Sequence, residues 1–328
     1  MRHPQRTLVV AALLTAAALS TGCSEKTKNA VSTDDFVVSV PTFSADSAYH
    51  YVAAQCAFGP RIPGSDAHSA CGDWLADELR SRGAVVVEQR AELKRWDGSV
   101  PARNIIGQFA PEKRRRVLLC SHWDSRPWAD NDSHEENRYT PIDGANDGAS
   151  GVGVLLEIAR HLQQQQPEVG IDILFFDAED GGVHQDVGAS VADTWCLGSQ
   201  YWARHPHADG YMARYGILLD MVGGKDARFC QEQMSVRYAK SIVDKVWSTA
   251  HAIGFGAYFP YRPGSYVTDD HLPINEGQRI PCIDIIPYDE IDGFGPTWHT
   301  VDDNIAHIDP ATLRAVGQTV MQVIYSER

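Results

Sequence analysis

The chain has 328 residues, of which 43% are hydrophobic and 22% charged, with 27 Gly and 17 Pro. This ordinary globular composition excludes collagen-like, low-complexity and wholly disordered chains. The formal net charge of −14 repels phosphate backbones, so we expect no nucleic-acid partner. No apolar run reaches the ~18 to 20 residues that a membrane-spanning helix needs.

The N-terminal residues have the pattern of a secretory signal. Two arginines precede an apolar stretch over residues 8–19, and small residues then lead to Cys23. This arrangement resembles a bacterial lipobox, in which the cysteine carries a lipid, although Leu19 lies one position further from the cysteine than usual. The alternative is secretion without an anchor. We predict a signal peptide over residues 1–22, a tether over 23–35, a periplasm-facing location in the cell envelope, and membrane contact only through the lipid.

In the rest of the chain, apolar runs typical of strands alternate with amphipathic stretches typical of helices. We expect helices over residues 45–57, 69–82, 151–163, 198–204, 233–251 and 310–326. We expect strands over residues 84–87, 104–109, 117–120, 171–176, 215–221 and 280–286. This alternation predicts an α/β sandwich with a mixed, largely parallel central sheet flanked by helices. No linker divides the body, so residues 36–328 are expected to form a single catalytic domain.

Six cysteines follow the lipobox cysteine. An oxidising compartment permits disulfides, but the pairing of six cysteines cannot be read from a sequence. No C-x-x-C pair is present, so a thiolate zinc site is not expected. We expect buried, small hydrophobic residues with one or two bridges among Cys56, Cys71, Cys120, Cys196, Cys230 and Cys282.

Polar residues gather where four of the expected strands end. The clusters begin at Ser121, Asp177, Asp220 and Thr297. In open α/β sheets, ligands bind outside the carboxyl ends of the strands. Four such clusters in one chain predict a functional site at that edge of the sheet.

A glycine-rich segment over residues 143–151 leads into the third expected helix. A tight turn there would hold Asp147 against the sheet edge as a metal ligand. The alternative is a simple helix cap formed by Asn146, Asp147 or Ser150, although capping needs only one such residue.

Glu179 and Asp180 are adjacent carboxylates just after an apolar strand. Two like charges near a sheet are unfavourable unless a cation lies between them or one takes a proton. The simplest explanation gives them separate roles, with Asp180 as a metal ligand and Glu179 as general base or acid. The alternative is a solvated loop, which explains the acidity but not the similar pattern at Asp147 and Asp220.

Two carboxylates and one imidazole suit a catalytic zinc that keeps one position open. Among thirteen histidines, His299 is the best candidate for the imidazole ligand. His122 is its strongest rival, and His122 and Asp124 could support the first metal or bind a second one.

Taken together, these segments resemble the glutaminyl cyclases of animal type, which share their fold with the co-catalytic zinc aminopeptidases. The matching order runs from about Phe58 to Asn304, which is nearly the whole mature chain. The segments are His122-Trp123-Asp124-Ser125, Asp147, Phe175-Phe176-Asp177-Ala178-Glu179-Asp180, Leu197-Gly198-Ser199, Leu218-Leu219-Asp220, Asp269-Asp270-His271-Leu272-Pro273 and Trp298-His299-Thr300-Val301-Asp302-Asp303-Asn304.

The resemblance implies an enzyme with one zinc per chain. It would convert an N-terminal glutamine of peptides or proteins to pyroglutamate and release ammonia. The implied zinc ligands are Asp147, Asp180 and His299, and Glu179 is the implied general base and acid. Nothing in the sequence fixes the oligomeric state.

The resemblance also implies roles around the substrate. Asp269, hydrogen-bonded to Asp220, would stabilise the amide nitrogen. Trp298 would form an apolar wall, with Phe294 and Thr268 as further substrate-binding residues.

Two positions depart from the family pattern. Asp180 stands where the family usually has Glu, which puts the ligand geometry in question. Gln185 lies in a region where the animal enzymes carry a tryptophan, so the pocket wall is expected to differ.

Two rival functions remain open. A non-catalytic binding protein on the same fold should have lost the base or a ligand, and this chain has lost neither. A di-zinc aminopeptidase would share most of the ligand positions, although Trp298 and the Asp269-Asp270-His271 element favour the cyclase. Its two metals would use His122, Asp147, Asp180, Asp220 and His299.

Overall fold

The structure is a computed structural model that describes residues 39–187, 194–288 and 293–328. The expected signal peptide and tether, with Cys23, lie outside these residues. In the part of the chain that is described, no helix is both long enough and apolar enough to cross a membrane.

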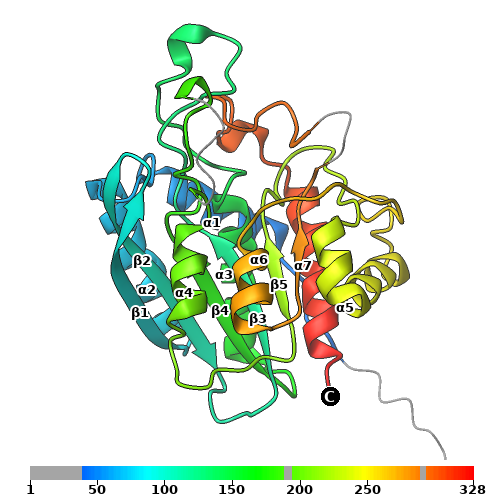
Figure 1. The fold of residues 1–328 in the computed structure, drawn as a ribbon. Coiled ribbons are helices and arrows are strands. Elements are labelled where there is room, and N and C mark those ends of the chain that lie inside the picture. Colours follow the sequence, from blue (N-terminus) through cyan, green and yellow to red (C-terminus); the bar gives the residue numbers. More distant parts are fainter. Residues whose placement is uncertain (1–38, 188–193, 289–292) are drawn as a thin grey trace, which may run out of the picture. The chain divides into compact units, whose positions relative to one another are not determined.

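Six strands form one mixed sheet in the order β1-β2-β4-β3-β5-β6 (Figure 1). Strands β4, β3, β5 and β6 run parallel, whereas β2 is antiparallel to both β1 and β4. The sheet is therefore mixed and largely parallel, as predicted. The strands are β1 (Val85–Arg95), β2 (Gly98–Phe109), β3 (Arg116–His122), β4 (Gly170–Phe176), β5 (Gly216–Leu219) and β6 (Cys282–Ile285).

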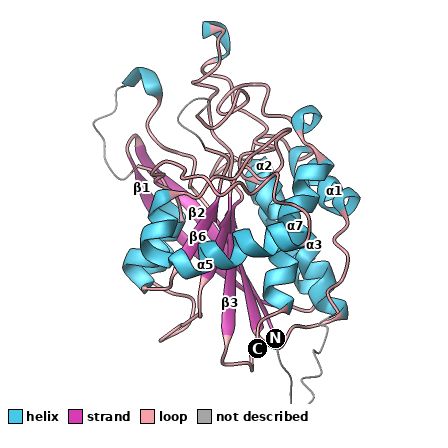
Figure 2. Ribbon diagram, turned by 90° about the vertical axis from the view of Figure 1, so that its right-hand side faces the viewer, coloured by secondary structure: helices cyan, strands magenta, loops and turns pink. Residues whose placement is uncertain are grey.

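Helices cover both faces of this sheet. Figure 2 shows α1, α3 and α7 together on one side, where they pack against one another. The short α6 and the turn after it pack with α4 on the opposite face. The helices are α1 (Ala45–Cys56), α2 (Asp66–Ser81), α3 (Ala149–Gln164), α4 (Leu197–Arg204), α5 (Gln233–Ala252), α6 (His271–Pro273) and α7 (Pro310–Tyr325). Single turns lie at η1 (Glu135–Asn137), η2 (Gln185–Val187), η3 (Ile274–Gln278) and η4 (Ile305–His307).

The central strands are apolar along nearly their whole length because helices cover both of their faces. Every residue of β3 and β4 is buried. Since successive side chains point to opposite faces, Leu119 and Ile173 join the core under α3, while Leu118 and Leu174 pack on the α4 side. A core on each face fixes the register of the sheet, and so fixes which residues stand at its carboxyl edge.

The edge hairpin departs from the expected strands. β1 extends to Arg95 rather than ending at residue 87, and β2 begins at Gly98 rather than at residue 104. These extensions were missed because β1 is largely exposed or half-buried and carries charged side chains. An apolar run is a good signal for a covered strand and a poor one for an edge strand.

The cysteines behave as buried small hydrophobic residues, with one correction to the expectation. Of the six described cysteines, five are buried and Cys56 is half-buried, and no disulfide joins any two of them. The expected one or two disulfide bridges are therefore absent. Most of these side chains pack in the hydrophobic core, which needs no covalent link to hold its shape.

An ion pair is buried at the end of the sheet where β3 and β4 begin. Arg116 donates to both carboxylate oxygens of Asp172, at 2.7 and 2.6 Å, and the Tyr211 hydroxyl donates to the same carboxylate at 2.8 Å. Both charged side chains are buried. The pair lies at the opposite end of β4 from the predicted site.

We expect Asp172→Ala to lower the free energy of unfolding by about 3 to 5 kcal/mol, because it leaves the Arg116 guanidinium buried without its partner. Urea denaturation would measure the loss. The matched control is Asp77→Ala, which breaks an exposed pair with Arg80 and should cost about 1 kcal/mol or less. Equal losses in the two variants would contradict a structural role for the buried pair.

Candidate metal centre and catalytic pocket

Three parallel strands deliver acidic and imidazole side chains to one edge of the sheet. β3 ends at His122, and its register pairs His122 with Phe176 at the end of β4. Glu179 follows β4 closely, and Asp220 directly follows β5. The carboxyl ends of parallel strands meet at the same edge, so the sequence prediction for this site is confirmed in its placement.

Asp147 is held in the turn that begins α3. Its backbone N–H and that of Asn146 donate to the Asp303 carboxylate, at 3.1 and 2.7 Å. The next residue, Gly148, has a φ of 112°, and a Cβ there would lie 2.7 Å from the His122 ring. Only glycine fits this turn. α3 has no side-chain cap, so the alternative of a simple helix cap does not describe Asp147.

Asp124 fixes the loop that carries the adjacent carboxylates. One of its oxygens accepts a hydrogen bond from the Glu179 N–H and the other from the Asp180 N–H, each at 3.1 Å. Asp124, Glu179 and Asp180 are all buried. The alternative of a solvated loop is therefore wrong.

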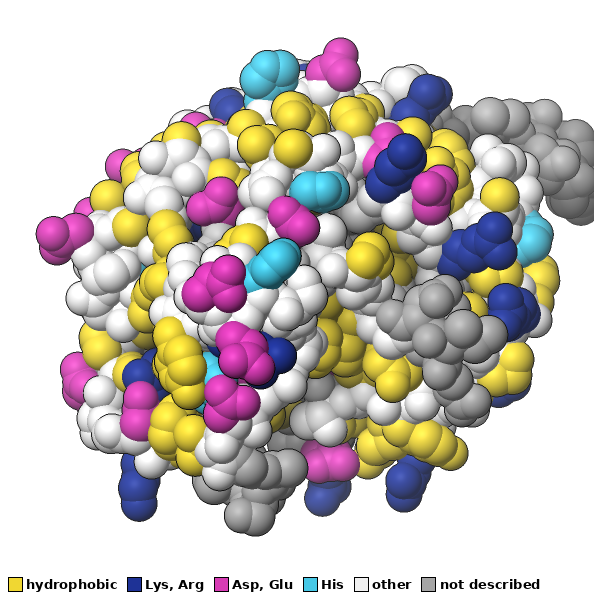
Figure 3. Space-filling model, turned by 90° about the horizontal axis from the view of Figure 1, so that it is seen from above, with side chains coloured by type: hydrophobic (Ala, Val, Ile, Leu, Met, Phe, Trp, Pro, Cys, Tyr) yellow, Lys and Arg dark blue, Asp and Glu magenta, His cyan; other side chains and the backbone are white. Residues whose placement is uncertain are grey.

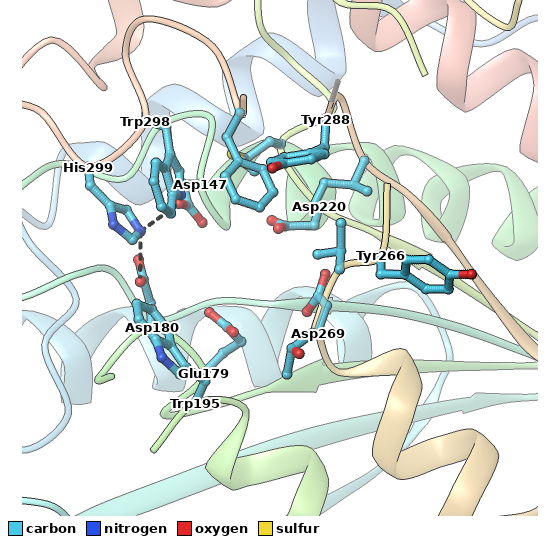
Figure 4. A pocket seen from close by; sticks show the side chains of 15 residues that line it. Asp147, Glu179, Asp180, Trp195, Asp220, Tyr266, Asp269, Tyr288, Trp298 and His299 are labelled. Atoms are coloured by element: carbon cyan, nitrogen blue, oxygen red, sulfur yellow. Dashed lines mark ion pairs between the residues drawn. The ribbon is translucent and has the colours of Figure 1, made fainter. Parts of the chain in front are cut away.

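Asp147, Asp180 and His299 form a cluster whose potential ligand atoms lie within 4.8 Å of one another. The His299 Nε2 atom is 3.2 Å from Asp180 Oδ1 and 3.5 Å from Asp147 Oδ2 (Figure 4). Both Asp180 oxygens are buried yet accept no hydrogen bond from the described residues. Orphaned buried carboxylate oxygens beside an imidazole fit a zinc ion, for which two carboxylates and a histidine are a suitable donor set.

Side chains that the sequence prediction did not include support His299. Its Nδ1 atom is 3.6 Å from Asp130, which accepts from two Arg126 nitrogens at 2.7 and 2.6 Å. A carboxylate on the second ring nitrogen orients a metal-binding histidine. The ring is also stacked with the rings of Trp298 and Trp195, at centroid distances of 3.9 and 5.9 Å. No periodic pattern marks Asp130 or Trp195, because only the folded loops bring them to His299.

His122 forms a second cluster on the other side of Asp147. Its Nε2 atom is 2.9 Å from Asp147 Oδ1 and 3.1 Å from Asp220 Oδ1. The two oxygens of Asp147 therefore face two different histidines. The expected hydrogen bond from Asp269 to Asp220 stays a prediction; the described side-chain hydrogen bond of Asp220 is with His122, which stands at the end of the neighbouring strand.

Asp269 lines the pocket and also belongs to a buried acidic layer beside it. Its carboxylate accepts from the Asp270 N–H and lies beside His271 and Asp284. The His271 ring stands between Glu232 and Asp284, with nitrogen–oxygen distances of 3.3 and 3.9 Å.

Burial and mutual repulsion raise the pKa values of several acids in the site. Burial, reinforced by the Asp147 charge, raises the pKa of Asp220 to about 6. Burial and the Asp220 charge raise the pKa of Asp269 to about 7. Burial also raises the pKa of Glu179 well above its usual range, with Asp180 adding to the effect. Without a cation in the site, protonation of these acids therefore lowers the repulsion among them.

The clusters line one side of a pocket of about 290 Å³. Figure 4 shows the carboxylates of Asp147, Glu179, Asp180 and Asp220 directed into it. Aromatic and aliphatic side chains line the other side: Trp195, Met221, Val267, Ile286, Tyr288, Phe294 and Trp298. This volume lies at the small end of ligand pockets, so it suits a single side chain.

All three predicted substrate-binding residues, Trp298, Phe294 and Thr268, line this pocket. The Phe294 ring is 4.5 Å from Trp298 and 4.4 Å from Tyr288, centroid to centroid, which makes a continuous aromatic wall. Gln185 does not line the pocket, and Trp195 supplies an aromatic ring on the side next to Asp180.

Acidic side chains are spread among exposed hydrophobic ones over the face seen in Figure 3. The loops that follow β3 and β6 reach this end of the molecule in Figure 1. The acidic side chains on this face agree with the net charge of −14 of the sequence.

We expect the metal-free protein to lose stability as the pH rises from about 5 to 8. The folded chain keeps protons on Asp220 and Asp269 that the unfolded chain has released near pH 4, so raising the pH favours unfolding. The raised pKa of His299 acts in the same direction. Zinc bound by Asp180 and His299 would displace the protons that their raised pKa values favour, so its stabilising effect should grow with pH.

Melting temperatures measured across this pH range, with and without zinc, would test the expectation. The double variant Asp220→Asn/Asp269→Asn should flatten the slope of the metal-free protein. A melting temperature of the metal-free protein that climbs steadily from pH 5 to 8 would contradict it.

Comparisons with known proteins agree with this geometry. Residues 104–324 match the model of Peptidase family M28. The structure of a glutaminyl cyclase from Bacteroides thetaiotaomicron, bound to N-acetylhistamine, is 56% identical with a TM-score of 0.87, covering 88% of this chain and 100% of that chain. A leucine aminopeptidase precursor from the same organism is also 56% identical with a TM-score of 0.87, covering 89% of this chain and 100% of that chain.

A more distant relative is also a glutaminyl-peptide cyclotransferase. The glutaminyl-peptide cyclotransferase of Drosophila melanogaster is 26% identical over 287 residues, covering 77% of this chain and 73% of that protein. The predicted zinc aminopeptidase-like fold is confirmed, and so is the predicted relationship to the glutaminyl cyclases. The chain belongs to peptidase family M28 and has the α/β fold of the bacterial glutaminyl cyclases in that family.

Proposed function

We propose that this protein is a glutaminyl-peptide cyclotransferase, which converts the N-terminal glutamine of peptides or proteins to pyroglutamate and releases ammonia. One observation carries the proposal. A pocket sized for one side chain combines a metal-binding cluster, a separate buried carboxylate and an aromatic wall. The similarity to a glutaminyl cyclase over the whole length of that chain supports it.

Glu179 is suited to move the proton in this reaction. The substrate's α-amine forms a bond to its own γ-carbonyl carbon, and the bond from that carbon to the amide nitrogen breaks. Glu179 would take a proton from the attacking amine and give it to the departing nitrogen, which leaves as ammonia. Its raised pKa suits a group that must hold the proton between the two transfers. The Asp269 carboxylate, close to Glu179, would accept a hydrogen bond from the amide nitrogen.

Asp147, Asp180 and His299 would hold zinc, which acts as a Lewis acid on the γ-carbonyl when it is bound. We propose one zinc per chain. His122 already contacts both Asp147 and Asp220 at hydrogen-bonding distance, whereas neither Asp180 oxygen accepts a hydrogen bond from the described residues, although Arg126 lies 3.5 Å from one of them. The demand for a cation is therefore greater in the cluster around Asp180.

The pocket wall supports selectivity for the first residue of the substrate. Trp298 and Phe294 would pack on the methylene groups of the glutamine side chain, with Thr268 at the same pocket. A pocket of about 290 Å³ suits one side chain, so the rest of the peptide would extend out of it. Holding the side chain in this way brings the amine and carbonyl together, so the enzyme uses proximity within one substrate molecule.

A second candidate is a di-zinc aminopeptidase. The observation in its favour is the placement of Asp147, whose two oxygens face His122 on one side and His299 on the other. All five side chains that such a centre would use are assembled: His122, Asp147, Asp180, Asp220 and His299. The two candidates differ in product and metal count, so both can be tested.

We also propose that the mature protein is anchored in the cell envelope by a lipid on Cys23, facing the periplasm. The support is the order of a short apolar segment, small residues and cysteine at the N-terminus.

A peptide that begins with glutamine should be cyclised by the protein and should not lose its first residue. Mass spectrometry of the products, with a leucine-initiated peptide in parallel, would measure both reactions. Glu179→Gln should keep its zinc and lose at least the ~100-fold in turnover typical of a general base. Efficient release of leucine, with the glutamine peptide left uncyclised, would establish the aminopeptidase instead.

Metal analysis of active, dialysed protein should give one zinc per chain. His299→Ala should lose zinc and activity together, because it removes a ligand from the cluster with the orphaned oxygens. His122→Ala is the matched variant from the other cluster and should keep the zinc. Two tightly held zinc ions, one of them lost in His122→Ala, would overturn the proposed stoichiometry.

Cys23→Ser should release a soluble and active enzyme, because it removes the attachment point of the lipid. Cell fractionation with an activity assay on each fraction would show the change. Retention of the variant in the membrane fraction would argue against the anchor.

A further inference from the structure

Cys196 contacts Glu179 from behind the pocket. Its Sγ atom lies 3.2 Å from Glu179 Oε1, and its backbone N–H donates to the Glu179 carbonyl at 3.0 Å. The side chain is buried, with 2% of the residue exposed, and it is not among the residues that line the pocket. Glu179 therefore separates Cys196 from the space that a substrate would occupy.

The thiol is the hydrogen-bond donor in this contact. Burial raises the pKa of Cys196 well above its usual range, and the Glu179 charge adds to the shift. The sulfur thus stays protonated and can donate only to Glu179 Oε1, its one described side-chain partner. The other oxygen of Glu179 is 4.0 Å from His122 Nδ1, beyond hydrogen-bonding distance.

The backbone leaves this contact little freedom. Cys196 has a φ of 57° and Ala178 a φ of 53°, both in the left-handed region that disfavours a side chain. A second hydrogen bond runs from the Leu197 N–H to the Ala178 carbonyl at 3.0 Å. At the start of α4, a Cβ on Gly198 would lie 2.1 Å from the Asp177 carbonyl. The segment that carries the thiol is pressed directly against the segment that carries the base.

We propose that Cys196 is a positioning residue, whose S–H group fixes the rotation of the Glu179 carboxylate. Because the Cys196 S–H group donates to Glu179 Oε1, Glu179 Oε2 is the oxygen that exchanges protons with the substrate. The inference rests on the proposed role of Glu179 as general base. It assigns a function to a cysteine that forms no disulfide.

Steady-state kinetics on a glutamine-initiated peptide test this role with three substitutions at one position. Cys196→Ala should lower kcat about tenfold, the effect of one hydrogen bond of about 1.4 kcal/mol, and leave KM within about twofold. Cys196→Ser should recover most of the lost kcat, because a hydroxyl can donate to the same oxygen. Cys196→Gly relieves the backbone strain without restoring a donor, so it should stay as slow as Cys196→Ala.

The matched control is Cys71→Ala, which removes another buried thiol that packs in the hydrophobic core away from Glu179. It should change the melting temperature but not kcat. An unchanged kcat in Cys196→Ala would overturn the proposal, as would recovery by glycine instead of serine, since that pattern indicates a purely structural role.

Infrared spectroscopy gives a readout that does not depend on activity. The difference between wild type and Cys196→Ser isolates the S–H stretching band of this thiol. The band should lie at lower frequency in wild type than in Glu179→Ala, because the carboxylate weakens the S–H bond. An identical frequency in the two proteins would refute the contact.

The two proposals fail in different ways. If wild type forms no pyroglutamate, the cyclase assignment is wrong, and the same three variants are then compared by release of N-terminal amino acids. Loss of kcat with recovery by serine in that assay would still support the positioning role, and its absence would still overturn it.

Discussion

Mutual repulsion among buried carboxylates is the interaction on which the active end of this molecule depends. The parallel strands bring Asp147, Glu179, Asp180 and Asp220 to one edge of the sheet, where water cannot screen them. Hydrogen-bond donors that the fold holds in place offset this repulsion. Backbone N–H groups face Asp124 and Asp303, and imidazoles face the remaining acids. A zinc ion held by Asp147, Asp180 and His299 would complete the arrangement, so the fold and the chemistry would share one electrostatic requirement.

The parts of the site that sequence could predict are those set by topology. Residues that follow covered strands must meet at the carboxyl edge, and this logic correctly placed Glu179, Asp180 and Asp220. Which neighbour a side chain then contacts is decided by packing. Asp220 contacts His122 because the end of β3 lies beside the end of β5. The supports of His299, Asp130 and Trp195, were missed for the same reason. The edge hairpin was missed because exposed strands carry no apolar run.

Backbone strain gathers around the same edge. Ala178, Cys196, Met221 and His299 all have positive φ values although none is glycine. Such conformations cost of order 1 to 3 kcal/mol each and persist only where the surroundings enforce them. Here each of the four stands at or next to a side chain that faces the pocket or supports it. The hydrophobic cores on both faces of the sheet provide the stability that holds these segments in place.

The Asp124 carboxylate has a consequence for how such sites diverge. Because the Asp124 carboxylate accepts hydrogen bonds from two successive N–H groups, it fixes the backbone of Glu179 and Asp180. The positions of both residues are therefore set by the main chain and not by side-chain rotamers. The length of the side chain at residue 180 can therefore vary, with Asp here and Glu usual in the family that the sequence resembles, while the base stays where it is. With the backbone fixed in this way, the metal ligand at position 180 can change without moving the general base Glu179. Related chains with nearly identical backbones can then separate into enzymes with different reactions, each reached through changes that leave the other half of the machinery working.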